Sequence, residues 1–143
     1  RCQRYDLSRI SSEELFNFAN GMCLSPKGDY IYVVESFHPC VSRVPINSDG
    51  TFGKKEIFTE DIEIVPDGLA FDKDNNLFIS CYEPSRIYIA DTKGNTRLLI
   101  EDKHCTTMAH PTNIAISDDG KTMYTANLGR WHITEIDISD LYK

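Results

Sequence analysis

Three oxygen-bearing side chains stand at similar places in three similar segments of the sequence. Asn20, Asp67 and Asn113 each precede an apolar stretch, a turn and a second apolar stretch, and their spacings are 47 and 46 positions. Carboxylate and amide oxygens are what a hard cation such as Ca²⁺ selects, usually about six to eight at roughly 2.3–2.6 Å. A fold that repeats the segment around one axis would bring these oxygens together. The spacing indicates a metal site or, because Asn-Gly and Asp-Gly are turn formers, only a set of turns.

The same segments predict the fold. A period of about 40–50 residues made of short strands is typical of a β-propeller blade. Alternating apolar residues and turns rich in Gly, Asn, Asp and Pro divide each repeat into strands. We expect strands at 22–25, 30–35, 41–46 and 55–58, at 69–72, 77–82, 86–91 and 97–100, and at 114–117, 122–126 and 132–138. The sequence therefore predicts an all-β fold, a partial β-propeller of about three four-stranded blades.

The repeats also define boundaries along the chain. Residues 20–60, 67–101 and 113–138 form successive repeats, and residues 1–19 look like the end of a preceding blade. Residues 13–16 fit a fourth strand of that blade, whereas Ser11-Ser12-Glu13-Glu14 also fits a helix capping box. Propellers close with about 4–8 blades, so we expect this chain to be a fragment. Uncovered apolar side faces would then favour self-association or a missing partner segment.

Composition limits the classes of function. The chain has 143 residues, of which 26% are charged, and a formal net charge of −7, as is typical of a soluble globular domain. The acidic balance argues against a nucleic-acid partner, and no apolar run approaches the ~20 residues that cross a bilayer. The five cysteines form no Cys-x-x-Cys pair, and Cys23 and Cys81 lie in apolar strand patterns. Buried reduced thiols and a cytoplasmic location are therefore expected.

One acidic segment resembles a calcium loop without fulfilling its requirements. Asp72, Asp74, Asn76 and Glu83 occupy four EF-hand positions, but Leu77 stands where the loop needs Gly for its sharp turn. A strand pattern follows, where an EF-hand would continue as a helix. We therefore expect a solvated hairpin turn at residues 72–76.

Other side chains carry weaker signals. No Gly-x-Ser-x-Gly nucleophile motif is present. His38 and His110 each precede Pro in a loop, and either could be a general base near a channel mouth or only a solvated loop residue. Ordinary surface or packing roles are the simpler interpretation of four loop residues that could also shape a substrate pocket, namely Tyr82, Arg86, Arg130 and Trp131.

The motifs at the repeat starts resemble a known family. Phe18-Ala-Asn-Gly-Met-Cys-Leu-Ser-Pro, Pro66-Asp-Gly-Leu-Ala-Phe-Asp and His110-Pro-Thr-Asn-Ile-Ala are similar to motifs of the senescence marker protein (regucalcin)/gluconolactonase/luciferin-regenerating enzyme family. Paraoxonases and strictosidine-synthase-like proteins share the first pattern more distantly. The resemblance covers nearly the whole chain. It implies a six-bladed propeller with a divalent cation, usually Ca²⁺, in the central channel.

The resemblance also implies roles for individual residues. Asn20 resembles a metal-binding asparagine, and Asp67 resembles the metal-binding aspartate that is also the proposed general base. The family's remaining ligands, a glutamate and an earlier asparagine, would precede Arg1, so the chain corresponds to a C-terminal half. The loop Glu83-Pro84-Ser85 departs from the family pattern, and the identity of the substrate therefore does not carry over.

The implied activity is metal-dependent hydrolysis of a small-molecule lactone or ester. Ca²⁺ is the expected cofactor, with Zn²⁺, Mg²⁺ and Mn²⁺ as alternatives. The cation would polarise the carbonyl, and Asp67 would take the proton of a water molecule. The alternative is a non-catalytic calcium-binding or scaffolding propeller, because one fold hosts many functions. A third possibility is a half ring that stays inactive until it pairs with its missing half or with a copy of itself. No nucleic-acid or membrane partner is expected.

Overall fold

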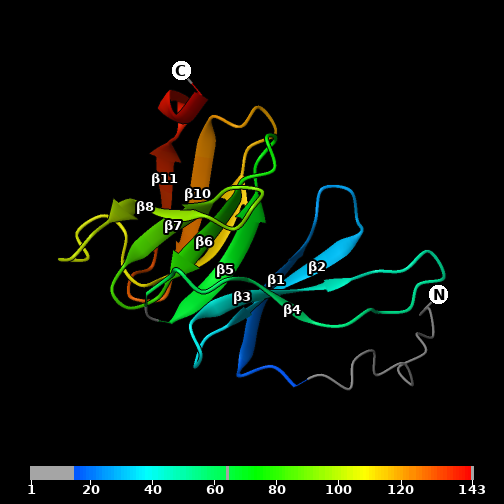
Figure 1. Ribbon diagram of the computed structural model, residues 1–143. Helices are drawn as coiled ribbons and strands as arrows, with labels where there is room; N and C mark the ends of the chain where they lie inside the picture. Colours follow the sequence, from blue (N-terminus) through cyan, green and yellow to red (C-terminus); the bar gives the residue numbers. More distant parts are fainter. Residues whose placement is uncertain (1–14, 64, 143) are drawn as a thin grey trace, which may run out of the picture.

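Short strands joined by tight turns and longer loops make up nearly all of the fold (Figure 1). The computed structural model describes residues 15–63 and 65–142, and within them it contains eleven strands and one short 3-10 helix. The elements are β1 (Ala19–Leu24), β2 (Tyr30–Glu35), β3 (Cys40–Pro45), β4 (Glu56–Thr59), β5 (Pro66–Phe71), β6 (Leu77–Cys81), β7 (Arg86–Ala90), β8 (Thr96–Glu101), β9 (Pro111–Ile116), β10 (Thr122–Asn127), β11 (Ile133–Asp137) and the helix Ser139–Tyr142.

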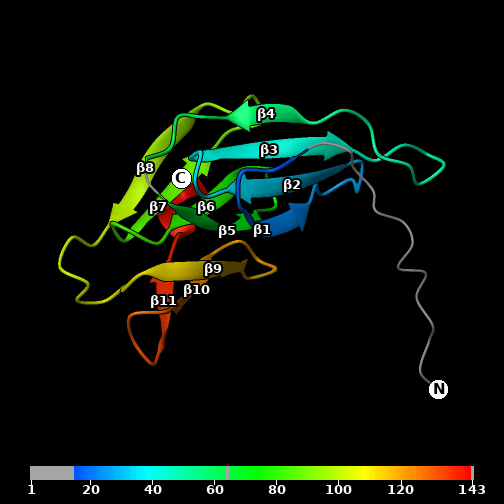
Figure 2. The same cartoon turned by 90° about the horizontal axis from the view of Figure 1, so that it is seen from below.

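The strands form three antiparallel sheets, which we call blades 1, 2 and 3. Blade 1 has the order β1-β2-β3-β4, blade 2 the order β5-β6-β7-β8, and blade 3 contains β9, β10 and β11 among the described residues. The first strand of each blade lies innermost, because β1 contacts β5 and β5 contacts β9. Figure 2 shows the other strands extending outward from these three. The predicted all-β fold, a partial β-propeller, is thus confirmed.

Left-handed residues close the turn between the first two strands of each blade. Gly28, Asn75 and Gly120 have φ angles of 71°, 66° and 72°. Gly and Asn tolerate this conformation best, which explains why the turns lie where their residue types predicted them. The expected strand 30–35 coincides with β2, but β1, β5 and β9 each begin three residues earlier than expected. The Asn20-Gly21 and Asp67-Gly68 pairs therefore lie inside strands.

Two hydrophobic cores hold the blades together, one on each side of blade 2. Side chains alternate between the two faces of a strand, and β6 shows the consequence. Leu77 and Ile79 join the core shared with blade 1, whereas Phe78 joins the core shared with blade 3. All three side chains are fully buried. β6 is apolar at every one of these positions because both of its faces are covered.

The cysteines of the described residues are free thiols. Burial raises the pKa of Cys23 and of Cys81 to about 12. Burial, with a smaller effect of the Glu35 charge, raises that of Cys40 to about 11. Thiols with such pKa values stay protonated at neutral pH and are poor nucleophiles. The structure thus agrees with structural rather than reactive cysteines at these three positions.

The outward sides of blades 1 and 3 carry exposed apolar side chains. On blade 1, a cavity of about 270 Å³ is lined by Phe16, Ala19, Met22, Ile31, Val33, Val44 and Phe52. On blade 3, Ile133 is 71% exposed and Tyr124 is also exposed. Such surface is what an adjoining blade would cover, so self-association or a completing segment stays a prediction. No helix among the described residues is long and apolar enough to cross a membrane.

Two expectations concern the start of the chain. Residues 1–14, which include the first half of the expected strand 13–16, lie outside the described residues. Leu15 and Phe16 are described and belong to neither a strand nor a helix. The assignment of residues 1–19 to the end of a preceding blade stays a prediction.

A buried ion pair stabilises blade 1. Glu35 is 4% exposed, and its carboxylate accepts hydrogen bonds from the Asn17 backbone N–H at 2.6 Å, from Lys55 Nζ at 3.1 Å and from the Ser42 hydroxyl. Burial alone would raise the pKa of Glu35, but these hydrogen bonds and the Lys55 charge outweigh it and lower the pKa. Glu35 therefore contributes stability above its unfolded-state pKa, and this contribution is lost as the pH falls through the folded-state value.

Replacing Lys55 with Met is expected to lower the free energy of unfolding at pH 7 by about 3–5 kcal/mol, because it leaves a buried carboxylate without its cation. Lys103→Met is the control, since Lys103 pairs with Glu101 at 3.3 Å but is mostly exposed. That change should cost about 0–1 kcal/mol. Urea unfolding at pH 7 measures both variants, and equal losses would contradict the assignment of Glu35 as a buried charge.

Candidate functional site

A β-bulge interrupts the innermost ladder of each blade at the same place. In β5 the extra residue is Asp67, and in β9 it is Thr112. The irregularity in β1 contains Asn20 and Gly21. The paired residues on either side of the bulge are Ala19–Glu35 and Met22–Val33 in blade 1, Pro66–Cys81 and Gly68–Ser80 in blade 2, and Pro111–Asn127 and Asn113–Ala126 in blade 3. Bulges re-aim side chains that would otherwise follow the pleat, so this repeated feature presents residues from three adjacent strands.

The backbone fixes which residues correspond. Phe18, Val65 and His110 are left-handed, with φ of 61°, 32° and 54°, and each stands two residues before the bulge residue. Thr112, not Asn113, therefore corresponds to Asn20 and Asp67, and the expected equivalence of Asn113 is wrong. Asn113 occupies the place of Gly68, and its Oδ1 accepts a hydrogen bond from the next backbone N–H at 3.0 Å.

The sequence contained a signal for this register. Gly21 precedes the turn glycine Gly28 by seven positions, and Asn113 precedes Gly120 by the same number. The turns demand a left-handed residue at a fixed place. Aligning the repeats on these turns, instead of on their first polar residues, would have identified Thr112 as the equivalent of Asn20 and Asp67.

Asn20 and Asp67 are brought together at the junction of blades 1 and 2. The side chain of Asn20 lies close enough to the Asp67 carboxylate to lower its pKa by hydrogen bonding. Its Nδ2 also lies 3.3 Å from Ser36 Oγ, and this buried hydroxyl donates to the Pro66 carbonyl at 2.7 Å. Burial raises the pKa of Asp67, and the Asn20 hydrogen bond offsets part of that increase. The result is a half-buried carboxylate with one neutral partner.

These two residues fit part of a cation site. No group of three or more His, Cys, Asp or Glu side chains within the described residues could hold a metal ion. Asn20 is outside that count, because its ligand atom is an amide oxygen. A carboxylate that burial disfavours gains most from a nearby cation, and Ca²⁺ accepts amide and carboxylate oxygens together. Two side chains cover only part of the about six to eight oxygens that Ca²⁺ takes. Their assignment as metal ligands stays a prediction.

A known family model matches most of the sequence. The profile of the SMP-30/gluconolactonase/LRE-like region matches residues 4–124, most of the chain. The chain belongs to this family. The resemblance stated from the repeat-start motifs is thereby confirmed. A search of curated proteins found no match.

Several solved structures share the fold at low sequence identity. A gluconolactonase from Xanthomonas campestris aligns with a TM-score of 0.66 and 17% identity over 78% of this chain and 35% of its own. A calcium-binding regucalcin from Agrobacterium tumefaciens gives 0.64 and 22% over 82% and 40%. A chain of a nidogen/laminin complex gives 0.66 and 18% over 80% and 41%. This family member therefore spans less than half the length of each of these chains.

Two buried serines, which sequence patterns did not reveal, tie the blades together near the bulges. Ser36 joins blade 1 to the Pro66 carbonyl, as described above. Ser80 accepts a hydrogen bond from the Gly68 backbone N–H at 2.9 Å and donates to the Thr112 carbonyl at 3.0 Å. Each hydroxyl thus binds the backbone directly beside a bulge. Serine in a strand carries no pattern that distinguishes such a role.

The remaining candidates divide into structural and exposed groups. Asp72 Oδ1 accepts hydrogen bonds from the backbone N–H groups of Asp74 and Asn76, both at 2.8 Å, so the EF-hand-like segment is a hairpin turn, as predicted. Asp72 itself is buried, not solvated. Arg86 forms ion pairs with Glu63 and Glu101, and these pairs give it a structural role. Trp131 is fully exposed.

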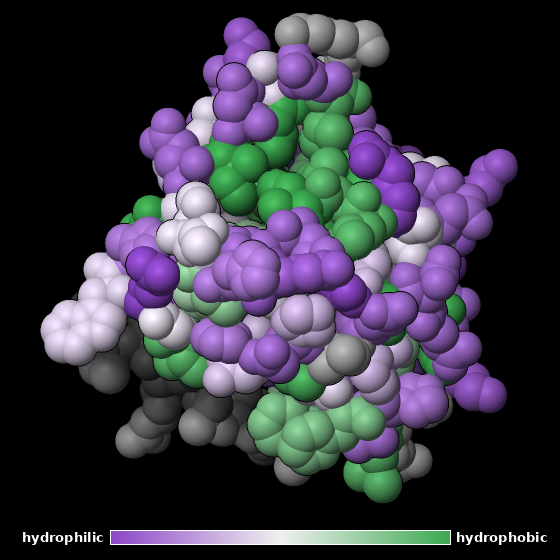
Figure 3. Space-filling model, turned by 90° about the vertical axis from the view of Figure 1, so that its left-hand side faces the viewer, coloured by the Kyte–Doolittle hydropathy of each residue, from purple (hydrophilic) through white to green (hydrophobic). Residues whose placement is uncertain are grey.

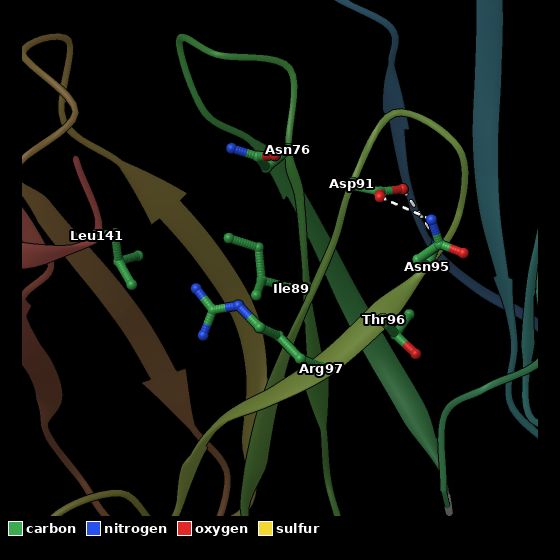
Figure 4. Close-up of a pocket in the computed structure, with 7 residues that line it drawn as sticks. All are labelled: Asn76, Ile89, Asp91, Asn95, Thr96, Arg97 and Leu141. Carbon is green, nitrogen blue, oxygen red and sulfur yellow. Dashed lines mark hydrogen bonds between the residues drawn. The ribbon is translucent and has the colours of Figure 1, made fainter. Parts of the chain in front are cut away.

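A cavity of about 410 Å³ lies between blade 2 and the end of the chain. Hydrophobic surface gathers near the C-terminal end on this side of the molecule (Figure 3). In Figure 4, Arg97 extends across the cavity toward the side that Leu141 forms. The Asp91 carboxylate is hydrogen-bonded within its own turn, where it accepts hydrogen bonds from Lys93 N, Asn95 N and Asn95 Nδ2 at 2.8–3.0 Å. The cavity does not include Asn20 or Asp67.

Proposed function

We propose that the whole protein hydrolyses a lactone or related ester with the help of a divalent cation, Ca²⁺ in the first place, held in part by Asn20 and Asp67. The observation that carries the proposal is the contact of these side chains on the bulges of adjacent inner strands. Membership of a family named for gluconolactonase supports it. A gluconolactonase and a calcium-binding regucalcin share the fold.

The chemistry follows from the two side chains. A cation bound there would supply polarisation of the substrate carbonyl and a lower pKa of a nearby water. Asp67 takes the proton of the attacking water, a role that requires its ionised form. Asn20 favours that form by its hydrogen bond, and Ser36 holds the Asn20 amide in place. The partial burial of Asp67 lowers the local dielectric constant, which strengthens these electrostatic interactions.

A binding module without turnover is the second candidate. The observation that favours it is the fold shared with a chain of a nidogen/laminin complex. Propellers serve catalysis and binding on the same frame, so fold alone does not choose between them. The chemistry of the Asn20–Asp67 pair favours hydrolysis.

Lactone hydrolysis by the whole protein, measured with and without chelator, tests the proposal. Turnover that chelator removes and Ca²⁺ restores is expected. This chain alone, with about two protein ligands where Ca²⁺ takes about six to eight oxygens, should show no turnover. Absence of turnover on a panel of lactones and esters, with Ca²⁺ bound, would contradict hydrolysis and favour the binding module without turnover. Activity that does not change when chelator is added would show that hydrolysis does not require the metal.

Replacing Asn20 with Ala is expected to weaken Ca²⁺ binding by about tenfold or more, as loss of one ligand or outer-shell partner does. Activity should recover in part at excess Ca²⁺, because Asp67 remains. The control is Asn47→Ala, at an exposed turn where Nδ2 contacts only Thr51 Oγ1 at 2.9 Å. A calcium titration of activity compares the two variants, and an unchanged calcium dependence in Asn20→Ala would show that the amide is no ligand.

A further inference from the structure

His110 has its ring nitrogens in two different environments. Nδ1 lies 2.9 Å from the Tyr82 carbonyl oxygen and 3.0 Å from Glu83 Oε2. A carbonyl oxygen can only accept a hydrogen bond, so Nδ1 carries the proton and donates it. Nε2 has no partner among the described residues. The neutral ring therefore keeps the lone pair of Nε2 available, and the protonated ring presents Nε2–H to whatever approaches.

The ring is held in place on several sides. It stacks on Tyr82 with ring centroids 4.8 Å apart, and the His110 backbone N–H donates to Ser85 Oγ at 2.9 Å. Its Cδ2 faces Gly129, where an added Cβ would lie only 2.4 Å away. The His110 side chain is 28% exposed, and its backbone is left-handed. A residue other than Gly in that conformation is uncommon and is found where surrounding structure enforces it.

The backbone places His110 close to Asp67. The Thr112 carbonyl lies beside Gly68, the residue that follows Asp67. His110 precedes Thr112 by two residues, which span at most about 7 Å. Tyr82, against which the ring stacks, donates its backbone N–H to the Val65 carbonyl at 2.9 Å, two residues before Asp67. Figure 2 shows β5 and β9 near one another at the centre of the molecule.

We propose that His110 is a further catalytic residue, which donates a proton from Nε2 to the leaving alcohol oxygen of the substrate. This inference rests on the proposed hydrolysis. Water adds to the carbonyl carbon and gives one proton to Asp67. The bond between that carbon and the ring oxygen then breaks, the carbonyl re-forms as the acid, and the alkoxide takes the Nε2 proton. The proton on Asp67 returns through solvent to Nε2, so the cycle closes without another reactant.

Charges around the ring support this role. The Glu83 carboxylate and the Tyr82 carbonyl oxygen both lie at Nδ1, so they orient the ring and hold the proton of the neutral ring on that nitrogen. Two titratable side chains contact the ring: Glu83 pairs with Nδ1 and Tyr82 stacks on it. Cys105 is one step further away, with Sγ 3.4 Å from Ser85 Oγ. His38 is different, since its Nε2 lies 3.5 Å from Glu60 Oε1 and both side chains are mostly exposed.

The test compares leaving groups in the whole protein. A proton donor matters for an alkyl lactone, whose alkoxide is a poor leaving group, and much less for an aryl ester. His110→Gln should therefore lower kcat/KM by about 10²-fold on an alkyl lactone and by less than about tenfold on a phenyl ester. It should also remove the alkaline limb of the pH profile for the lactone. Glu83→Gln should lower lactone turnover in the same selective way, but less. His38→Gln is the matched control and should change neither substrate.

The outcomes separate the two proposals. Equal losses on both substrates, or an unchanged alkaline limb, would make His110 a structural residue and leave the proposed hydrolysis intact. No turnover in the unaltered protein would overturn both. Nitrogen-15 histidine spectra check the geometry without activity, because they must show Nδ1–H on His110 and a bare Nε2 in the neutral ring. The opposite tautomer would overturn the assignment, and thermal melts verify that His110→Gln is folded.

Discussion

Replacing Asp67 with Asn is expected to abolish lactone hydrolysis by the whole protein. Loss of a general base alone lowers kcat/KM by about 10²–10⁴-fold, and this substitution also removes the formal charge that Asp67 offers a cation. Asn is nearly isosteric and still accepts the Asn20 hydrogen bond. Folding should be preserved, because burial disfavours the charged form of Asp67 and the neutral Asn side chain avoids that cost.

Two measurements make this prediction specific. Asp74→Asn is the control, since Asp74 is an exposed acid in the neighbouring turn and pairs with Lys73 at 3.0 Å. It should retain full activity. In the unaltered protein, turnover should rise with pH as Asp67 ionises. Asn20→Ala should move this acid limb to higher pH, because it removes the hydrogen bond that lowers the Asp67 pKa. Full activity of Asp67→Asn would exclude Asp67 as the base and favour the binding module.

The fold was predictable from sequence because its determinants are local. Turn residues recur at fixed offsets, and β2 begins and ends where the alternation of its own side chains predicts. The predicted starts of β1 and β5 were wrong, because Asn-Gly and Asp-Gly indicate turns by local propensity. Here the neighbouring blade keeps them extended as bulged strand. Tertiary contacts override propensity at these positions, and they are the positions of the candidate site.

The candidate site was predictable only in part. Asn20 and Asp67 were found because repetition placed similar oxygens in register, and the structure brings them together. Ser36 was not predicted, and His110 could not be distinguished from His38, because their environments depend on contacts between residues 16 or more positions apart. Glu35 and Lys55 show the same limit, since an isolated charge in a strand gives no sign that its partner lies 20 residues away.

Gly68 is a position where folding is expected to be highly sensitive to an added side chain. A Cβ there would lie 2.3 Å from the Thr112 carbonyl oxygen, 2.8 Å from Asn113 Cα and 2.9 Å from Ser80 Oγ. Two of these three atoms belong to backbone, which cannot rotate away, so blades 2 and 3 would have to separate. Overpacking in a core costs about 1–3 kcal/mol, and a clash with backbone belongs at or above the upper end.

Gly68→Ala should therefore lower the free energy of unfolding by about 3 kcal/mol or more, as measured by urea denaturation. The control is Gly53→Ala, where the nearest atom is a Pro45 side-chain carbon at 3.1 Å and the neighbour can yield. That change should cost less than about 1 kcal/mol. Equal stability of the two variants would mean that β5 and β9 are not in close contact. The same contact holds the strand that carries Asp67 against the strand that follows His110. Any Gly68→Ala protein that still folds should therefore lose activity beyond its loss of stability, because a separation of about 1 Å between these strands misplaces both groups at once.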